Sequence, residues 1–253
     1  MKNMFITGGS GLVGMYVLDH FLKKKFKVFT TVRSMKSKNY LEKKFKKFCQ
    51  NGFLLILKQD FNNNEFEKKT VSFMKKQNFI PNILINNARN INNLNTGKNS
   101  DIDDLYWKNE FHLTIISAYK LTRILMKNYS KTLRRVINIS SIYGTVAINR
   151  TLQEFSKTPV PMNYSVCKAA LIQMTKEFTA KYGDANLTFN SISYGGISGR
   201  ESELFRKKYS ELSPNRTMLD VDEITSAINF LIDTKSSAIN GHNLIVDGGW
   251  TVW

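Results

Sequence analysis

The glycine-rich segment at residues 8–14 constrains the fold more than any other part of this sequence. Its glycines at positions 9, 11 and 14 follow a short apolar run at residues 4–6 and precede apolar residues at helical spacing. Glycine permits a tight turn and a close backbone approach to a ligand, and a helix N-terminus offers free N–H groups to an anion. We therefore expect a strand, a turn and a helix that bind the pyrophosphate of a dinucleotide, the alternative being a merely structural turn.

Apolar runs alternate with amphipathic segments along the whole chain. Short apolar runs predict strands at residues 4–6, 28–32, 53–57, 83–85, 135–140, 187–193 and 243–246. Apolar residues at helical spacing predict helices at residues 12–22, 39–49, 65–76, 104–128, 164–182 and 221–233. This order predicts an α/β fold with a doubly wound, Rossmann-like parallel sheet in a single domain, residues 1–253. Two long irregular stretches, about residues 144–163 and 196–220, are expected to be substrate loops.

The composition excludes several classes of protein. With 42% hydrophobic and 23% charged residues, a chain of 253 residues can bury a core and is neither disordered nor of low complexity. Its two cysteines, Cys49 and Cys167, are too few for a disulfide framework or a four-ligand zinc site, so we expect a cytoplasmic location and no metal. Neither a signal peptide nor a membrane-spanning apolar run is visible, and no membrane partner is expected.

The net charge of +17 has three interpretations. The lysines and arginines could solvate the surface, attract an anionic substrate or bind nucleic acid. The lysines are scattered in short groups, such as residues 23–25 and 46–47, and alternate with Phe and Leu on polar helix faces. We therefore favour a solvated surface with no nucleic-acid partner, and keep an anionic substrate as the alternative.

The end of the second predicted strand bears on the choice of cofactor. In chains that bind NAD, an acidic residue about 20 positions beyond the glycines holds the ribose 2′-hydroxyl. Here Arg33 and Ser34 follow the strand, and a guanidinium with a hydroxyl can bind the 2′-phosphate of NADP. We expect NADP as the cofactor and keep NAD as the alternative, in which Arg33 is only solvated.

Tyr164 and Lys168 form the candidate chemical site. Their i, i+4 spacing at the start of a predicted helix places both side chains on one face. A neighbouring ammonium lowers the pKa of a phenol from about 10, so that tyrosine can act as general acid and base near neutral pH. Ser141, directly after the predicted strand at residues 135–140, can hydrogen-bond a substrate oxygen beside the tyrosine.

Several motifs occur together in an order typical of one family. They are the glycine turn, Asn86-Asn87-Ala88, the Ser141 segment, Tyr164-x-x-x-Lys168, residues 190–195 and Val246-Asp247-Gly248-Gly249. With them the chain resembles the compact, single-domain branch of the short-chain dehydrogenase/reductase family over essentially its whole length. The resemblance implies an NAD(P)-dependent oxidoreductase (EC 1.1.1.-) that transfers a hydride between the nicotinamide and a carbonyl or secondary alcohol.

The resemblance also implies roles for single residues. Tyr164 exchanges a proton with the substrate, Lys168 lowers the tyrosine pKa and binds the nicotinamide ribose, and Ser141 orients the substrate oxygen. Ser140 is expected to be structural. Besides Tyr164 and Lys168, the residues implied to bind the cofactor are Thr7, Gly8, Gly9, Ser10, Gly11, Leu12, Val13, Gly14, Arg33, Ser34, Asp60, Phe61, Asn86, Asn87, Ala88, Gly195 and Ile197.

Some positions depart from the family pattern. Arg89 follows Asn-Asn-Ala where the family usually has glycine, and it either contacts phosphate or substrate or points outwards. Thr114, with His112 nearby, stands where the family often has a catalytic asparagine, which puts the family's water relay in doubt. The predicted substrate loops hold several cations that either meet an anionic substrate or serve only solubility, among them Arg150, Arg200, Arg206 and Arg216.

The motif details most resemble bacterial oxidoreductases of surface-polysaccharide and flagellin-glycan pathways. This implies a small-molecule substrate, a sugar or sugar derivative that can be anionic, in carbohydrate metabolism and polysaccharide biosynthesis. Two other functions stay open: a sugar dehydratase or epimerase that uses the cofactor transiently, slightly favoured by the spacing of residues 7–14, and a non-catalytic dinucleotide-sensing regulator. Family members usually pair through their long fourth and fifth helices, so a homodimer or homotetramer is expected.

Overall fold

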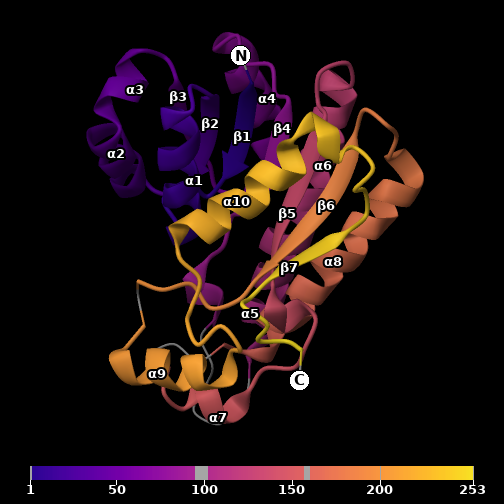
Figure 1. Cartoon of the computed structure of the whole chain (residues 1–253). Helices are drawn as coiled ribbons and strands as arrows, with labels where there is room; N and C mark the ends of the chain where they lie inside the picture. The colour runs from indigo at the N-terminus through magenta and orange to yellow at the C-terminus, as the bar shows by residue number, and fades with distance from the viewer. Residues whose placement is uncertain (1, 95–101, 157–159, 200, 253) are drawn as a thin grey trace.

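A seven-stranded parallel sheet forms the centre of the computed structural model, which describes residues 2–94, 102–156, 160–199 and 201–252. The strand order is β3-β2-β1-β4-β5-β6-β7, with a crossover from one edge back to the middle between β3 and β4 (Figure 1). This order confirms the predicted single-domain, doubly wound Rossmann-like fold. The strands are β1 (Asn3–Thr7), β2 (Lys27–Val32), β3 (Leu54–Lys58), β4 (Ile83–Asn86), β5 (Arg135–Ser141), β6 (Thr188–Tyr194) and β7 (Asn243–Val246).

Helices cover both faces of the sheet (Figure 1). α1 and α10 pack on one face together with α2, and α4, α6 and α8 pack on the other. The longer helices are α1 (Leu12–Lys23), α2 (Met35–Lys44), α4 (Phe66–Lys76), α5 (Asp104–Phe111), α6 (Ser117–Tyr129), α8 (Met162–Tyr182), α9 (Glu203–Leu212) and α10 (Val221–Ile232).

The central residues of β1 are apolar without interruption because both faces of the strand are buried. Side chains alternate between the two faces of a strand, so Met4 and Ile6 pack against α1 and α10, whereas Phe5 faces the opposite layer. There Phe5 stacks on Phe29 of β2 with ring centroids 4.3 Å apart. Because helices cover both faces, neither set of side chains meets water, and a parallel strand of this kind has no polar alternation.

Two predicted helices are interrupted in the structure. The helix expected at residues 39–49 is instead α2 followed by the short α3 (Lys46–Gln50). The helix expected at residues 104–128 is divided into α5 and α6 by a turn of π-helix, η2 (His112–Ile116). A π-helical turn adds a residue to the helix and redirects the side chains around it, and such turns often occur at functional sites.

The two predicted substrate loops are partly helical. The first contains a 3₁₀ turn, η3 (Ile142–Gly144), and the short α7 (Arg150–Gln153), and the second contains α9. α7 and α9 lie together at the end of the molecule where the strands finish (Figure 1). Ligands of doubly wound folds bind at this end of the sheet.

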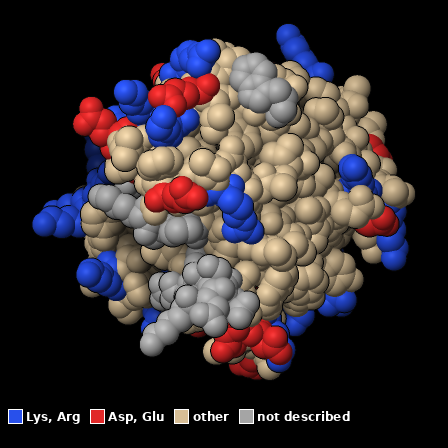
Figure 2. Space-filling model, turned by 90° about the horizontal axis from the view of Figure 1, so that it is seen from below, with Lys and Arg blue, Asp and Glu red and all other residues tan. Residues whose placement is uncertain are grey.

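Charged side chains are spread over this end of the molecule rather than gathered. Figure 2 shows it with Lys and Arg side chains placed singly or in small groups, with Asp and Glu between them. That distribution fits a solvated surface. Among the described residues, no helix has the length and apolar character of a membrane span, and no group of three or more His, Cys, Asp or Glu suits a metal ion.

Candidate active site

A cleft of about 1090 Å³ opens at the carboxyl ends of the strands. The turn after β1 forms one side of it, and the ends of β4, β5 and β6 form its floor. Most of the residues proposed from the sequence line this one cleft. They are Gly8, Ser10, Gly11, Leu12, Val13, Arg33, Ser34, Asp60, Phe61, Asn87, Ala88, Ser141, Tyr164, Lys168, Gly195 and Ile197.

The glycine turn fits the pyrophosphate of a dinucleotide. Gly8 has a φ of +73°, a left-handed conformation that disfavours other residues. A Cβ at Gly14 would collide with the backbone of Gly8 and Gly9, so only glycine lets α1 start this close to the strand. Gly11 caps α1 without a side-chain hydrogen bond, which leaves N–H groups of the first helical turn available to an anion in the cleft.

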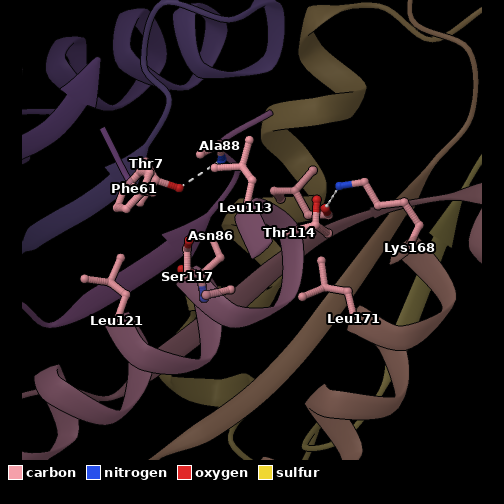
Figure 3. A pocket seen from close by; sticks show the side chains of 12 residues that line it. Thr7, Phe61, Asn86, Ala88, Leu113, Thr114, Ser117, Leu121, Lys168 and Leu171 are labelled. Atoms are coloured by element: carbon pink, nitrogen blue, oxygen red, sulfur yellow. Dashed lines mark hydrogen bonds between the residues drawn. The ribbon is translucent and has the colours of Figure 1, made fainter. Parts of the chain in front are cut away.

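Four of the proposed cofactor residues, Thr7, Gly9, Gly14 and Asn86, do not line the main cleft. Thr7 and Asn86 instead line a pocket of about 20 Å³ beneath it, shown in Figure 3. The amide of Asn86 donates to Oδ1 of Asn138 at 2.8 Å and to Oγ1 of Thr122 at 3.2 Å. The side chain of Asn86 therefore points between the sheet and α6 and supports the cleft from the interior.

The end of β4 is fixed to the end of β1 by one hydroxyl. Oγ1 of Thr7 accepts hydrogen bonds from the backbone N–H groups of Asn87 and Ala88, both at 2.9 Å. Figure 3 shows the bond from Ala88. The side-chain amide of Asn87 also donates to the carbonyl oxygen of Thr7 at 2.9 Å. Asn87 and Ala88 are thus held in the wall of the cleft by a rigid framework.

Ser141, Tyr164 and Lys168 meet in the cleft although they come from two elements. Ser141 ends β5, and Tyr164 lies in the first turn of α8, only 7% exposed. The side chain of Ser141 hydrogen-bonds the phenol of Tyr164, and Nζ of Lys168 lies 5.5 Å from the centroid of that ring. The close packing of α8 on this strand end requires Gly144, since a Cβ there would lie 2.8 Å from the backbone of Lys168.

The ammonium of Lys168 is held by the backbone of β5. Its Nζ donates to the carbonyl oxygen of Ile139 at 2.7 Å, as Figure 3 shows. Oγ of Ser140 donates to the carbonyl oxygen of Lys168 at 3.0 Å, so Ser140, which also borders the cleft, joins strand to helix. Lys168 therefore remains a fixed cation beside the tyrosine.

The pKa of Tyr164 lies below the ordinary value of 10.0. Burial alone would raise the pKa, but the guanidinium of Arg89, the ammonium of Lys168 and the hydrogen bond from Ser141 favour the phenolate and outweigh it. Burial raises the pKa of the nearby Tyr143 to about 12, although Gln153 hydrogen-bonds that hydroxyl. Of these two cleft tyrosines, Tyr164 is therefore the one with a lowered pKa.

Two residues make contacts near Tyr164 that the sequence did not reveal, Arg89 and Glu110. Arg89 points into the cleft, where its guanidinium carbon lies 4.4 Å from the ring centroid of Tyr164, so it does not point away from the site. Glu110 has no exposed surface and accepts hydrogen bonds from Thr114 at 2.8 Å and Asn93 at 3.3 Å. The sequence marks Arg89 only by its departure from glycine, and Glu110 looks like an ordinary polar residue of a helix.

An aromatic cluster joins the two predicted substrate loops. Trp250 stacks on Tyr209 of α9 with ring centroids 5.9 Å apart and meets Tyr143 edge-on at 6.0 Å. The hydroxyl of Tyr209 accepts a 2.7 Å hydrogen bond from the N–H of Gly196, and Gln153 of α7 donates to the hydroxyl of Tyr143 at 3.2 Å. The loops therefore pack as one unit over the cleft.

The loop cations are not part of the cleft wall in the described part of the chain. Arg150 and Arg206 are exposed and do not line the cleft. Arg216 donates to the carbonyl oxygen of Glu211 at 2.9 Å on the surface of its own loop. Arg200 lies outside the described residues. Arg89 and Arg33 are the arginines among the described cleft-lining residues.

A family model described as "Enoyl-(Acyl carrier protein) reductase" matches residues 13–251. The chain belongs to the short-chain dehydrogenase/reductase family. It is an oxidoreductase with the NAD(P)-binding fold of that family, which confirms the family and the enzyme class that the motifs predicted.

Individual relatives cover different parts of the chain. The 3-oxoacyl-(acyl-carrier-protein) reductase of Buchnera aphidicola subsp. Acyrthosiphon pisum is 28% identical over 98% of this chain and 96% of its own length. The post-translational flagellin modification protein A of Campylobacter coli is 30% identical over 46% of this chain, and the match spans 45% of that protein. A short-chain dehydrogenase from Leptospira borgpetersenii with bound NAD⁺ superimposes with a TM-score of 0.83 at 25% identity, covering 99% and 92% of the two chains.

Proposed function

We propose that this short-chain dehydrogenase/reductase transfers a hydride reversibly between NADP(H) and a carbonyl or secondary alcohol of a sugar or sugar derivative, with Ser141, Tyr164 and Lys168 as its catalytic residues. One observation carries the proposal. The hydrogen-bonded pair of Ser141 and Tyr164 faces the same cleft as the glycine turn, with Lys168 fixed beside it. A dinucleotide bound to that turn and a substrate at the phenol would share one space.

The chain's own residues supply the proton chemistry of this reaction. When bound along the glycine turn, NADPH would supply the hydride that the carbonyl carbon receives. Tyr164 donates its phenolic proton to the carbonyl oxygen, which becomes the hydroxyl of the product, and Ser141 hydrogen-bonds the same oxygen. The positive charges of Lys168 and Arg89 stabilise the tyrosinate left behind. In the direction of oxidation, the tyrosinate takes the hydroxyl proton back.

The end of β2 supports NADP over NAD. Arg33 is exposed in the cleft, and Ser34 caps α2 by accepting a 3.1 Å hydrogen bond from the N–H of Ser37. The first turn of α2 contains no acidic residue, so a helix N-terminus and a guanidinium face this part of the cleft without a carboxylate in that turn. This surrounding suits the 2′-phosphate that distinguishes NADP from NAD.

The substrate class rests on the cleft wall and on one relative. Aromatic side chains from both loops, Tyr143, Phe205 and Tyr209, line the cleft together with polar groups, as in sites that bind amphipathic ring compounds. The partial match to a flagellin modification protein supports a role in bacterial glycan biosynthesis. We further propose that the chain acts in the cytoplasm as a homodimer or homotetramer.

Turnover assays with the purified chain test this function. NADPH consumption is measured with keto-sugars, and NADP⁺ reduction with the matching alcohols, for wild type and Tyr164→Phe. A net change in the cofactor that depends on Tyr164 supports the proposal. Conversion of a sugar without a net cofactor change would instead identify a dehydratase or epimerase, and no Tyr164-dependent conversion of any carbonyl would contradict the proposed chemistry.

A further inference from the structure

The reacting end of the cleft contains a second cation, Arg89, besides Lys168. The guanidinium carbon of Arg89 lies 4.4 Å from the ring centroid of Tyr164, closer than Nζ of Lys168 at 5.5 Å. A guanidinium packs favourably on aromatic faces, so this contact holds the Arg89 head group beside the ring.

The backbone that presents Arg89 is also fixed. The two residues before it, Asn87 and Ala88, donate their backbone N–H groups to Oγ1 of Thr7 at 2.9 Å. These bonds anchor the segment to the end of β1, within the sheet. Arg89 therefore extends from a rigid point, and one end of its side chain is set by the sheet and the other by Tyr164.

The charge of Arg89 is available to a ligand, in contrast to that of Lys168. Lys168 is buried and donates to the carbonyl oxygen of Ile139 at 2.7 Å. Arg89 is exposed in the cleft, and no carboxylate within the described ranges forms an ion pair with it. The parallel N–H donors of a guanidinium match the two oxygens of a carboxylate.

We propose that Arg89 binds a carboxylate of the substrate close to the carbonyl that is reduced. Arg89 contacts the ring of Tyr164, and the hydroxyl of that ring donates its proton to the carbonyl oxygen. The carboxylate bound by Arg89 therefore lies within a few bonds of the reacting carbon. The substrate class is then an oxo acid, or a hydroxy acid in the reverse direction, and a sugar substrate becomes a sugar acid. The position of the carbonyl rests on the proposed function, whereas the anion site rests on Arg89 alone.

Calorimetric titration with malonate tests this site without any turnover. Malonate is titrated into the free enzyme and into the enzyme loaded with NADP⁺, for wild type, Arg89→Gln, Arg89→Lys and Arg89→Gly. Loss of a charge-assisted, bidentate contact predicts that Arg89→Gln and Arg89→Gly weaken malonate binding at least about tenfold, with Arg89→Lys in between. Neutral malonamide should bind wild type and all three variants with the same affinity.

Arg123→Gln is the matched control. Arg123 also lies over a tyrosine ring, 5.6 Å from the centroid of Tyr119, but it is near Glu67 and does not line the cleft. Its replacement should leave malonate affinity unchanged. Circular dichroism of each variant verifies that it is folded, which the exposed position of Arg89 leads us to expect.

The outcomes separate the anion site from the proposed function. Absence of malonate binding to wild type, or equal affinity in wild type and Arg89→Gln, overturns the proposal. Tighter Arg89-dependent binding of inorganic phosphate than of malonate overturns the assignment of a carboxylate. With glucose and glucuronate as substrates, Arg89→Gln should raise KM for glucuronate alone. Arg89-dependent malonate binding without turnover of either sugar would support the anion site and contradict the proposed sugar chemistry.

Discussion

The hydroxyl of Thr114 donates a 2.8 Å hydrogen bond to Glu110, a carboxylate with no exposed surface. Thr114 belongs to the π-helical turn His112–Ile116, and Glu110 to the helix directly before it. The second carboxylate oxygen accepts a 3.3 Å hydrogen bond from Asn93, in the segment that follows β4. Glu110 thus joins the π-helical turn to the chain that carries Arg89 into the cleft.

Glu110→Ala should destabilise the fold markedly. The substitution leaves the buried polar groups of Thr114 and Asn93 without this partner, at roughly 1–3 kcal/mol for each such group. Thermal unfolding should show the loss as a decrease of several degrees in Tm. Glu65→Ala is the control: Glu65 is an exposed acid with only a 3.8 Å ion pair, and its replacement should change Tm little. Equal effects of the two substitutions would contradict a structural role for Glu110.

The π-helical turn illustrates what the sequence could not reveal. Apolar spacing predicted one helix over residues 104–128, because a single extra residue in a turn changes the side-chain pattern too little to register. The buried Glu110 was equally hidden, since its partners Thr114 and Asn93 are joined to it by the fold and not by a recognisable motif. The strands were better predicted, because residues buried on both faces form continuous apolar runs.

The residues of the candidate site also differ in how well the sequence predicted their positions. Glycine turns and the Tyr164-x-x-x-Lys168 spacing are local patterns, and the structure brings them to one cleft as expected. Asn86 was expected to border the cofactor, but its amide bonds Asn138 and Thr122 in the interior. Local sequence fixes which strand end a residue occupies, but contacts with neighbouring strands and helices decide which way an interior amide points.

Tyr164→Phe should abolish turnover and preserve the binding of NADPH. The substitution removes only the proton-donating hydroxyl, and a general acid–base group contributes about 10²–10⁴-fold to the rate. Steady-state assays measure turnover, and NADPH fluorescence measures binding. Tyr129→Phe, at the far end of α6, provides the control and should retain full turnover. Rates near wild type in Tyr164→Phe would exclude Tyr164 as the acid–base group.

The pH profile of alcohol oxidation should reveal the electrostatic surroundings of Tyr164. Oxidation needs the tyrosinate, so kcat should rise with pH and level off above the pKa of Tyr164, which lies below its ordinary value. Burial raises that pKa and Arg89 is the first of the groups that lower it, so Arg89→Gln should move the midpoint to higher pH. A midpoint that stays in place would show that Arg89 does not act on the phenol.

NADPH should bind more tightly than NADH, and Arg33→Ala should reduce the difference. One charge-assisted contact to the 2′-phosphate contributes about 1.5–3 kcal/mol, or tenfold and more in affinity. Fluorescence titrations of both nucleotides measure the ratio. Lys43→Ala removes an exposed charge from the opposite end of α2 and should leave the ratio unchanged. Equal or tighter binding of NADH by wild type would refute the NADP preference.

The chain should form a symmetric dimer or tetramer through the exposed faces of α6 and α8. Tyr119 of α6 remains 42% exposed beside the ring of Phe178, and Val166 and Tyr182 of α8 remain 46% and 39% exposed. Exposed apolar side chains on adjacent helices form a patch. In a two-fold symmetric dimer, such a patch is buried against the same patch of the second subunit. Light scattering should therefore give a multiple of 29.1 kDa at micromolar concentration.

Single charges placed on these two helices should dissociate the assembly. Tyr119→Glu or Val166→Glu would bury a carboxylate against its symmetry copy, so a particle of 29.1 kDa is expected in light scattering. Ile80→Glu is the matched control, because Ile80 is 50% exposed but lies between α4 and β4 and belongs to neither helix. The particle mass of this variant in light scattering should equal that of the wild-type assembly. A wild-type chain of 29.1 kDa, or an assembly unaffected by both helix variants, would place the interface elsewhere or exclude one.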